Sequence, residues 1–531
     1  MEEAAFSGSF ITLLIGLITL LLLYWYTTRN HDYWRKRKIP FVKPLPIIGT
    51  LLDSFYKPLH VIEIERYRKY GQIYGQFDGS GPGITIGDPR LLKNIMVKDF
   101  PTFSSRGRGK TGDPIVDKML VFLNGADWKR IRTIITPTFT TGKIKKMMSI
   151  FKDSAKTCVN SFKKYAASKK PVDAKIIYGA FTMDVIASSA FSTKIDSYND
   201  PNNKFVSTAR SLFSRGILRF ILFTIVVVLR IPLPIKPSQS KGMKFFKEVT
   251  LQIIEERTKT GKTRNDFLQL LLDTAEETAE QENQFPAESE DVTANYGKDD
   301  VSENMFKNTE KKTSLSQDEM VAQCIIFFLA GYETTASTLS FASYILALHP
   351  EIQELLIAEL DESLKASNGE VTYETLQNMK YLDNVISETL RLYPPAARLQ
   401  RLADQDYVLG DTGITIPKGM PVNIPVCAMH IDPKLHPEPE SFKPERFSQD
   451  EKAKRDMYAY LPFGAGPRNC IGMRFALIEI KVCLAFILSN FRFRRCPQTK
   501  VPLEFRARQP ILQPKHVTLL MEPRTDGIKA V

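Results

Sequence analysis

A glycine-rich loop holds one cysteine in a setting that suits a metal ligand. Residues 463–472 read Phe-Gly-Ala-Gly-Pro-Arg-Asn-Cys-Ile-Gly, and a long apolar helical pattern follows them. Glycines allow a tight turn close to a flat ligand, and nearby amides can donate hydrogen bonds to the sulfur of Cys470. We expect Cys470 to open the following helix, whose dipole favours an anionic sulfur. The loop is therefore suited to supply the thiolate ligand of a haem iron.

Chance agreement with this pattern is improbable, because five residue types stand at fixed spacing. They are Phe463, Gly466, Arg468, Cys470 and Gly472. The alternative interpretation, a small buried apolar cysteine, suits the other cysteines of the chain better. Those five are scattered without a Cys-x-x-Cys pair, so the sequence indicates neither a zinc site nor a disulfide framework. A reduced, cytosol-facing compartment is favoured.

The loop resembles the signature of cytochrome P-450 monooxygenases, and other motifs extend this resemblance over almost the whole chain. Animal microsomal members are similar, both the vertebrate drug- and steroid-oxidising branch and the arthropod detoxification families, notably over residues 330–335 and 462–477. The resemblance implies a mainly α fold with small β-sheets, in which one large haem domain follows an N-terminal transmembrane helix. It also implies haem b (iron protoporphyrin IX), O2, a lipophilic small-molecule substrate, NADPH-cytochrome P-450 reductase, and cytochrome b5 as an additional partner.

Charge and composition agree with a membrane-associated globular enzyme. The chain has 531 residues, 43% of them hydrophobic, and a formal net charge of +13. Such a charge suits nucleic acid, anionic lipid or an acidic protein. Because no segment resembles a nucleic-acid-binding motif, membrane lipid and a protein partner are the expected partners, with no nucleic acid.

An uncharged apolar run over residues 10–26 ends in an aromatic cluster and is just long enough to span a bilayer. Acidic residues precede it and basic residues follow, which predicts a lumenal N-terminus and a cytosolic remainder in the endoplasmic reticulum membrane. A cleaved signal peptide, the alternative, would need a basic start and a small-residue cleavage site, and neither is present. We expect a membrane anchor over residues 1–27, a basic, proline-rich linker over 28–50, and a haem-thiolate domain over 51–531.

Two further segments stand out between the motifs. Residues 220–229 form a second apolar run, which is too short to cross a membrane and by length alone would be a buried core helix. Their similarity to the region between the F and G helices of the family favours a monotopic patch that dips into the bilayer. Residues 276–314 are polar without periodicity, which predicts a flexible surface insertion.

Most of the remaining chain is predicted to be helical. Strands are expected near residues 73–77, 83–86 and 407–422. An alternating α/β architecture is not supported, because long amphipathic helices outnumber strands in the C-terminal half.

A long buried helix is predicted over residues 318–348, with an interruption at residues 330–335. Gly331 would leave room above an iron, and Thr334 would turn its hydroxyl away from the i−4 carbonyl to admit dioxygen and water. Glu333 could relay protons from solvent. The alternative is that Thr334 only bonds back to the helix backbone and Glu333 is a solvated surface residue.

Two groups of charged residues are assigned by the resemblance. Glu388 and Arg391 lie three apart on one helical face, which alone would be a weak surface pair. The family implies that Arg446 joins them in a structural network behind the cysteine loop. Arginine suits carboxylates better than lysine does, and the haem-propionate partners implied by the family are Arg106, Trp128, Arg132, Arg401 and Arg468. Solvent-facing arginines are the alternative.

The resemblance implies a monooxygenase that uses NADPH-derived electrons to oxidise apolar small molecules such as xenobiotics or steroids. The pocket is expected from residues 107–123, 213–234, 328–330 and 396–399. Docking of an acidic reductase, or merely a solvated surface, is expected at Lys129, Arg130, Lys143, Lys145 and Lys146. Two alternatives remain: a haem-thiolate isomerase or dehydratase of peroxides, which Thr334 argues against, and a haem-binding protein without turnover.

Overall fold

The computed structural model describes residues 2–107, 111–191, 193, 195–200, 203–213, 241–264, 266–277 and 315–531. The apolar run at 220–229, the pocket stretch from 214 to 234 and the insertion from 278 onward lie outside the described residues. The first two residues of the expected insertion belong to the end of a helix, α12 (Phe267–Glu277).

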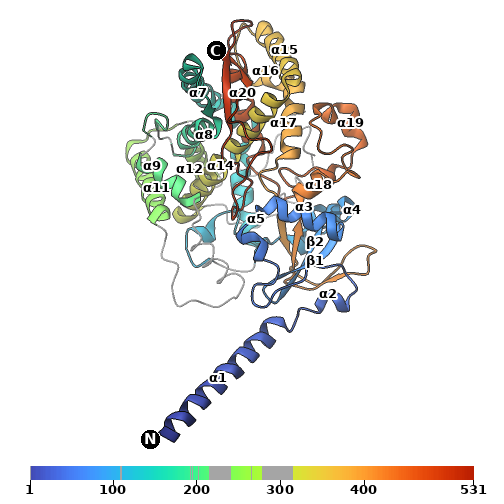
Figure 1. Cartoon of the computed structure of the whole chain (residues 1–531). Coiled ribbons are helices and arrows are strands. Elements are labelled where there is room, and N and C mark those ends of the chain that lie inside the picture. Colours follow the sequence, from blue (N-terminus) through green and yellow to red (C-terminus); the bar gives the residue numbers. More distant parts are fainter. Residues whose placement is uncertain are drawn as a thin grey trace.

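Helices dominate the described chain and the strands form small sheets, so the predicted fold class is confirmed (Figure 1). The helices are α1 (Glu2–Thr28), α2 (Tyr33–Lys36), α3 (Leu59–Tyr70), α4 (Pro89–Lys93), α5 (Gly125–Ile135), α6 (Thr141–Lys146), α7 (Met148–Ser168), α8 (Ala174–Phe191), α9 (Lys204–Phe213), α11 (Lys241–Thr260), α12, α14 (Gln317–Leu348), α15 (Pro350–Ala366), α16 (Tyr373–Asn378), α17 (Lys380–Leu392), α18 (Val426–His430), α19 (Gln449–Lys454) and α20 (Met473–Leu488).

The largest sheet has four strands in the order β1-β2-β7-β4. Its strands are β1 (Ile73–Asp78), β2 (Gly81–Ile86), β7 (Pro421–Ile424) and β4 (Leu399–Leu402). The first two correspond to the strands predicted near residues 73–77 and 83–86, and the structure pairs them as an antiparallel hairpin; β7 adds to β2 in parallel. The short strands expected near 407–422 are β5 (Tyr407–Val408), β6 (Thr415–Ile416) and the start of β7, and β5 and β6 form a separate hairpin.

A second sheet joins two strands near the C-terminal end of the chain to a short strand from the middle of the chain, and the sequence predicted none of the three. It has the order β3-β9-β8, formed by β3 (Val172–Asp173), β9 (Thr518–Pro523) and β8 (Phe491–Arg494). Strand β3 has only two residues, too few for a period-two pattern to be visible in the sequence.

The long helix α14 is the centre of the molecule and packs against α8, α11, α17 and α20. Ser316 and Glu319 form a reciprocal capping box at its start, which satisfies free backbone amides of the first turn. Most of its side chains are buried, as expected for a helix that is apolar nearly all round. The same composition gives it a span long and apolar enough to cross a membrane, but two thirds of that span lies inside the protein.

Helix α1 projects away from the rest of the molecule (Figure 1). Its span Phe10–Thr28 has a mean hydropathy of 2.0 and is almost entirely exposed, and by length and composition it is a candidate membrane span. The described chain thus carries the N-terminal apolar helix that the sequence predicted.

Part of the expected linker packs onto the large sheet. Trp34 is completely buried against the backbone of Gly75 in β1, and its indole nitrogen donates to the carbonyl of Gln76 at 3.2 Å. Thr50 makes a hydrogen bond with the amide of Phe77 at 3.2 Å. The proline-rich composition indicated a stiff segment but not this contact, which joins residues about forty positions apart.

Candidate functional site

A backbone hydrogen bond and two glycines with positive φ give the cysteine loop its tight shape. The amide of Cys470 donates to the carbonyl of Phe463 at 2.9 Å. Gly464 and Gly466 have φ values of +73° and +67°, a region that strains other residues. A Cβ at Gly466 would lie 2.0 Å from the carbonyl oxygen of Met96, so this position accepts glycine alone without a backbone shift.

Cys470 does not open the following helix, contrary to the expectation. Helix α20 begins at Met473, and Gly472 is its N-cap. The backbone amide of Gly472, at the start of α20, still favours the charged form of the Cys470 thiol. The positive charges of Arg132 and Arg106 act in the same direction. Burial is the larger effect and raises the pKa of Cys470 above its ordinary value. The thiol is nevertheless accessible, and it is the exposed one among the six free cysteines.

Four arginines converge beside this loop, as the resemblance implied: Arg106, Arg132, Arg401 and Arg468. Burial, together with the other arginines of the group, lowers the pKa of Arg132 to about 10, of Arg401 to about 9 and of Arg468 to about 8. The pKa of Arg106 is also lowered by burial. Such a concentration of buried positive charge favours an anionic group among the four side chains.

The hydrogen bonds of these arginines leave specific donors unused. Arg132 donates from both η nitrogens to Asn469, at 3.1 and 2.8 Å, and Arg401 donates to the Gln400 carbonyl at 3.0 Å. The ε nitrogens of Arg106, Arg132 and Arg401 are buried without a hydrogen-bond partner among the described residues. Since unused buried donors are costly, oxygen atoms of a bound anion would stabilise this site.

Arg468 is fixed more completely than the other three. Its guanidinium carbon lies 4.2 Å from the centroid of the Trp128 ring, a cation–π contact. Its nitrogens donate to the carbonyls of Ser104 and Leu123 at 2.8 and 2.6 Å. Trp128 and Arg132, four apart on α5, thus both contact the cysteine loop, one through Arg468 and the other through Asn469.

The middle of α14 differs from the prediction. The helix is continuous through residues 330–335, and the Thr334 hydroxyl donates to the Ala330 carbonyl at 2.7 Å. An uninterrupted backbone leaves this carbonyl available to the hydroxyl, which is the alternative that the sequence left open. Ala330 is exposed and Thr334 is half-buried, whereas their neighbours along the helix are largely buried.

Glu333 is not a solvent-exposed surface residue. Its side chain is 9% exposed and forms an ion pair with Lys175 of α8. The Ser337 hydroxyl lies 3.3 Å from the same carboxylate oxygen, and Lys175 also donates to Ser337 at 3.0 Å. Any proton that reaches Glu333 therefore has Lys175 or Ser337 as its first neighbour.

Phe328, an expected pocket residue, is completely buried in an aromatic cluster. Its ring centroid lies 5.7 Å from Phe191, 5.2 Å from Phe205 and 4.9 Å from Phe246. It therefore packs α14 against α8, α9 and α11, and the exposed position of the expected stretch is Ala330.

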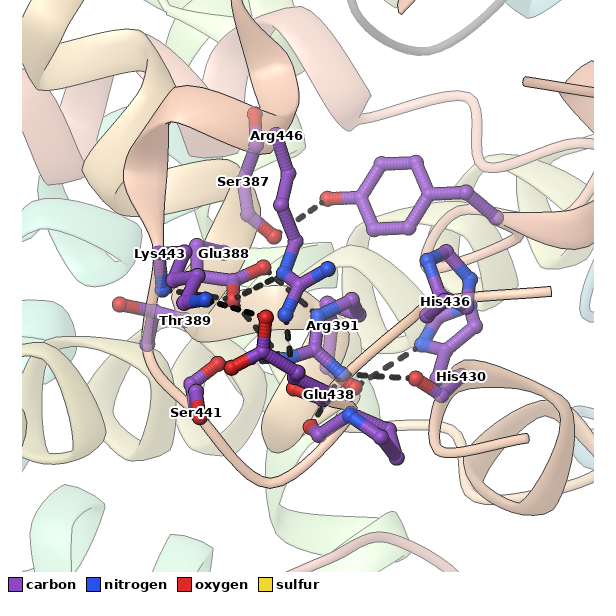
Figure 2. Close-up of polar contacts among 12 residues, drawn as sticks. Ser387, Glu388, Thr389, Arg391, His430, His436, Glu438, Ser441, Lys443 and Arg446 are labelled. Carbon is purple, nitrogen blue, oxygen red and sulfur yellow. Dashed lines mark hydrogen bonds and ion pairs between the residues drawn. The ribbon is translucent and has the colours of Figure 1, made fainter. Parts of the chain in front are cut away.

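Glu388, Arg391 and Arg446 form the implied charge network (Figure 2). Arg391 binds both carboxylate oxygens of Glu388, at 2.6 and 2.8 Å, and both side chains are fully buried. Arg446 approaches the same carboxylate at 3.2 Å, and the backbone amide of Lys443 donates to it at 2.9 Å. A carboxylate with this many donors is fully compensated, although burial of a lone charge would be costly.

Two of the five basic residues expected to dock a reductase already form ion pairs within the chain. Arg130 is paired with Glu319 and Lys145 with Glu374. Lys143 and Lys146 line a surface groove of about 340 Å³.

Sequence reasoning did not identify Lys175, Asn469 or Asn124 as site residues. The Asn124 side chain accepts from the backbone amide of Arg106 at 3.1 Å. A lysine that begins an apolar helix, as Lys175 does, is a weak signal for a buried partner. The two asparagines gave no signal apart from their position before α5 and beside Cys470.

Comparison with known proteins places this site in a family. The family model for Cytochrome P450 matches residues 39–298 and 294–521. Cytochrome P450 3A11 of Mus musculus is 41% identical over 516 residues, covering 96% of this chain and 95% of that protein. Cytochrome P450 3A2 of Rattus norvegicus is also 41% identical over 516 residues, with the same coverage. Cytochrome P450 3A14 of Cavia porcellus is 38% identical over 530 residues, covering 98% and 99%. The chain therefore belongs to the cytochrome P450 family of haem monooxygenases.

Proposed function

We propose that this protein is an NADPH- and dioxygen-dependent monooxygenase that oxidises lipophilic small molecules through a haem b bound by Cys470. The observation that carries this proposal is an accessible thiol in a glycine-shaped loop, beside three buried arginines and the half-buried Arg106. Xenobiotics and steroids are the proposed substrate classes, on the basis of similarity to the mammalian relatives above.

The described residues fit haem b in both charge and shape. Two propionate groups would supply the oxygen acceptors that the ε nitrogens of Arg106, Arg132 and Arg401 lack, and would offset the positive charge of the cluster. Arg468 and Trp128 would border the same edge of the ring, while Phe463, Gly466 and Gly472 shape the loop under its face. Cys470 would ligate the iron, and the bound haem would supply the activation of dioxygen.

The protein's own part in the chemistry is to hold sulfur, protons and substrate in place. The Gly472 amide favours the anionic form of the Cys470 sulfur, as a thiolate ligand requires. Thr334 would rotate its hydroxyl from the Ala330 carbonyl towards water and hold that water on the substrate side of α14. Glu333, through its contacts with Lys175 and Ser337, would keep a proton source one residue away.

Association with membrane and redox partners follows from separate segments. We propose α1 as a single-pass anchor in the endoplasmic reticulum membrane, with the catalytic domain facing the cytosol. Removal of residues 2–27 should then weaken sedimentation with membranes. Lys129, Lys143 and Lys146 are the basic residues proposed to meet an acidic NADPH-cytochrome P-450 reductase, with cytochrome b5 as a second donor.

An isotope experiment tests this function against its alternatives. The full-length protein is reconstituted with reductase and NADPH in vesicles and given a mixed lipophilic library under isotopically labelled dioxygen. The proposal expects product that carries one labelled oxygen atom and depends on NADPH. Rearranged peroxide formed without reductase would indicate an isomerase or dehydratase, and haem binding without any product would indicate a non-catalytic protein.

A further inference from the structure

His430 is a fully buried side chain for which the chemistry above has no use. It ends the short helix α18 and lies between α17 and the chain segment that leads into the cysteine loop (Figure 2). Its ring is stacked on that of Tyr460, with centroids 5.2 Å apart and an interplanar angle of 29°.

Two backbone contacts fix the tautomer of this histidine. The amide of Leu461 donates to Nε2 at 2.9 Å, so Nε2 must carry a lone pair and no proton. Nδ1 lies 3.1 Å from the backbone carbonyl oxygen of Arg391. Because a carbonyl oxygen can only accept, Nδ1 must carry the proton. His430 is therefore the neutral tautomer with its proton on Nδ1.

The environment maintains this neutral state. Burial holds the pKa of His430 well below its usual range, and the neighbouring charges of Arg391 and Arg455 act in the same direction. His436 lies 6.2 Å away, ring to ring, and burial likewise lowers its pKa. A second proton on His430 would place two donors face to face, on Nε2 and on the Leu461 amide.

His430 and Arg391 form two reciprocal hydrogen bonds. While the His430 ring donates to the Arg391 carbonyl, the Arg391 side chain donates to the His430 carbonyl at 2.8 Å. Arg391 is itself fixed by both carboxylate oxygens of Glu388. The His430 imidazole is therefore hydrogen-bonded to a residue whose side chain is itself held in a buried ion pair, Arg391 with Glu388.

On its other side the imidazole holds the start of the cysteine loop. Leu461, whose amide it accepts, also receives at its carbonyl a hydrogen bond from the Gly464 amide at 3.1 Å. Phe463, between them, accepts the amide of Cys470 at 2.9 Å. Hydrogen bonds thus link Glu388 to Arg391, Arg391 to His430 and His430 to Leu461, and the backbone of residues 461–464 continues covalently to Phe463, which accepts the Cys470 amide.

We propose that His430 is a positioning residue, which ties the start of the cysteine loop to the Glu388–Arg391 pair and so sets where the Cys470 sulfur meets the haem iron. This inference rests on the proposed function, because it assumes Cys470 as the ligand. The contact that matters is the acceptor at Nε2, since it alone reaches the loop.

Three substitutions separate the two contacts of the ring. His430→Gln places an amide oxygen near Nε2 and retains an acceptor for Leu461. His430→Asn places its amide nitrogen near Nδ1 and retains only the contact with Arg391. His430→Phe keeps the ring against Tyr460 and loses both hydrogen bonds.

The measurement is the ratio of thiolate-type to thiol-type spectrum in the reduced carbon monoxide complex of the full chain, together with the rate of haem loss to an apoprotein acceptor. His430→Phe and His430→Asn should lower the ratio and speed haem loss by about tenfold, the scale of one buried hydrogen bond. His430→Gln should stay close to wild type. A wild-type ratio in His430→Asn, or equal losses in all three variants, would overturn the proposal.

Gln353→Met is the matched control for general destabilisation. Gln353 is also fully buried and accepts a backbone amide, that of Phe493 at 2.7 Å, and its amide nitrogen donates to the carbonyls of Leu346 and Phe493, both outside the cysteine loop. Gln353→Met should lower the unfolding midpoint but leave the ratio of thiolate-type to thiol-type spectrum unchanged. A lowered ratio in Gln353→Met would also overturn the proposal. If the wild type itself lacked the thiolate-type spectrum, the proposed function would fail, whereas a normal wild type with normal variants would remove only the role of His430.

Discussion

Lys175 of α8 forms an ion pair with Glu333 of α14, and their side chains are only 15% and 9% exposed. The pair lies one residue from Thr334, so the acid next to the proposed oxygen-activation site is held by a cation rather than by water. Helices α8 and α14 make the most extensive contact between elements of the described chain, and this pair joins them electrostatically.

Removal of the lysine should therefore be costly. Lys175→Met leaves the Glu333 carboxylate largely buried without its cation, and we expect unfolding free energy to fall by about 2–3 kcal/mol, since the pair retains slight exposure. Urea titration monitored by tryptophan fluorescence measures this loss. The double variant Lys175→Met/Glu333→Gln should recover much of the stability, and a double variant as unstable as the single one would show that the charge is not the cause.

Thr334→Ala should uncouple the reaction while haem binding and the thiolate-type spectrum remain, because the hydroxyl is not a ligand. Without it, water and protons on the substrate side are less ordered, so more of the consumed NADPH should end as hydrogen peroxide and severalfold less as product. The measurement is product and peroxide per NADPH with one reductase and one substrate. Thr334→Ser keeps the hydroxyl and should stay coupled; an unchanged ratio in Thr334→Ala would exclude the residue from proton delivery.

The features predicted from sequence are those with local signals. The loop around Cys470, the two strands β1 and β2 and the long helix α14 each rest on spacing within a few dozen residues. The pair Glu388 and Arg391 is similarly local, being three apart on one helix face. For these, residue type and period are sufficient.

The missed features depend on contacts between distant parts of the chain. Lys175 meets Glu333 across 158 positions, and Arg132 meets Asn469 across 337. No periodicity encodes such pairs, because helix packing decides which faces meet. The Thr334 hydroxyl is a different case: its bond to Ala330 is local, but two rotamers were compatible with the same sequence.

Arg391→Met should be among the most destabilising substitutions in the chain. It leaves Glu388 buried without the cation that binds both its carboxylate oxygens, with only Arg446 and the Lys443 amide as donors. We therefore expect a loss of about 3–5 kcal/mol in unfolding free energy with little haem-loaded protein recovered. Arg446→Met is the control, since it removes one bond to Glu388 at 3.2 Å and one to the Glu438 carbonyl at 2.7 Å but leaves the two bonds from Arg391 to Glu388 in place. Denaturant titration should give a clearly smaller loss of unfolding free energy for Arg446→Met than for Arg391→Met. Equal losses would contradict the greater contribution of Arg391 to stability.

Asp184 of α8 should make stability depend on pH. Burial raises its pKa to about 6 in the folded protein, against roughly 3.9 in an unfolded chain. The folded state therefore keeps a proton that the unfolded state loses, and stability falls as pH rises from about 4 to about 6. The loss above this window is roughly 2–3 kcal/mol.

Asp184→Asn tests that sign directly. The amide oxygen can still accept from the Ser197 amide, as the carboxylate does at 3.3 Å, but it cannot ionise. The variant should gain stability relative to wild type at pH 7 and little at pH 4. Asp153→Asn, at an exposed position of α7, should show no such difference between the two pH values. A gain for Asp184→Asn that is independent of pH would mean that ionisation is not responsible.

The reduced carbon monoxide spectrum of Cys470→Ala, with Cys496→Ala as control, tests whether Cys470 is the ligand of the haem iron. Cys496 is a half-buried thiol outside the loop, so its loss should leave the thiolate-type spectrum of the wild type intact. We expect Cys470→Ala to lose this spectrum completely, because the other five cysteines lie outside the glycine-shaped loop. A thiolate-type spectrum that persists in Cys470→Ala would contradict the assignment of Cys470 as the haem ligand.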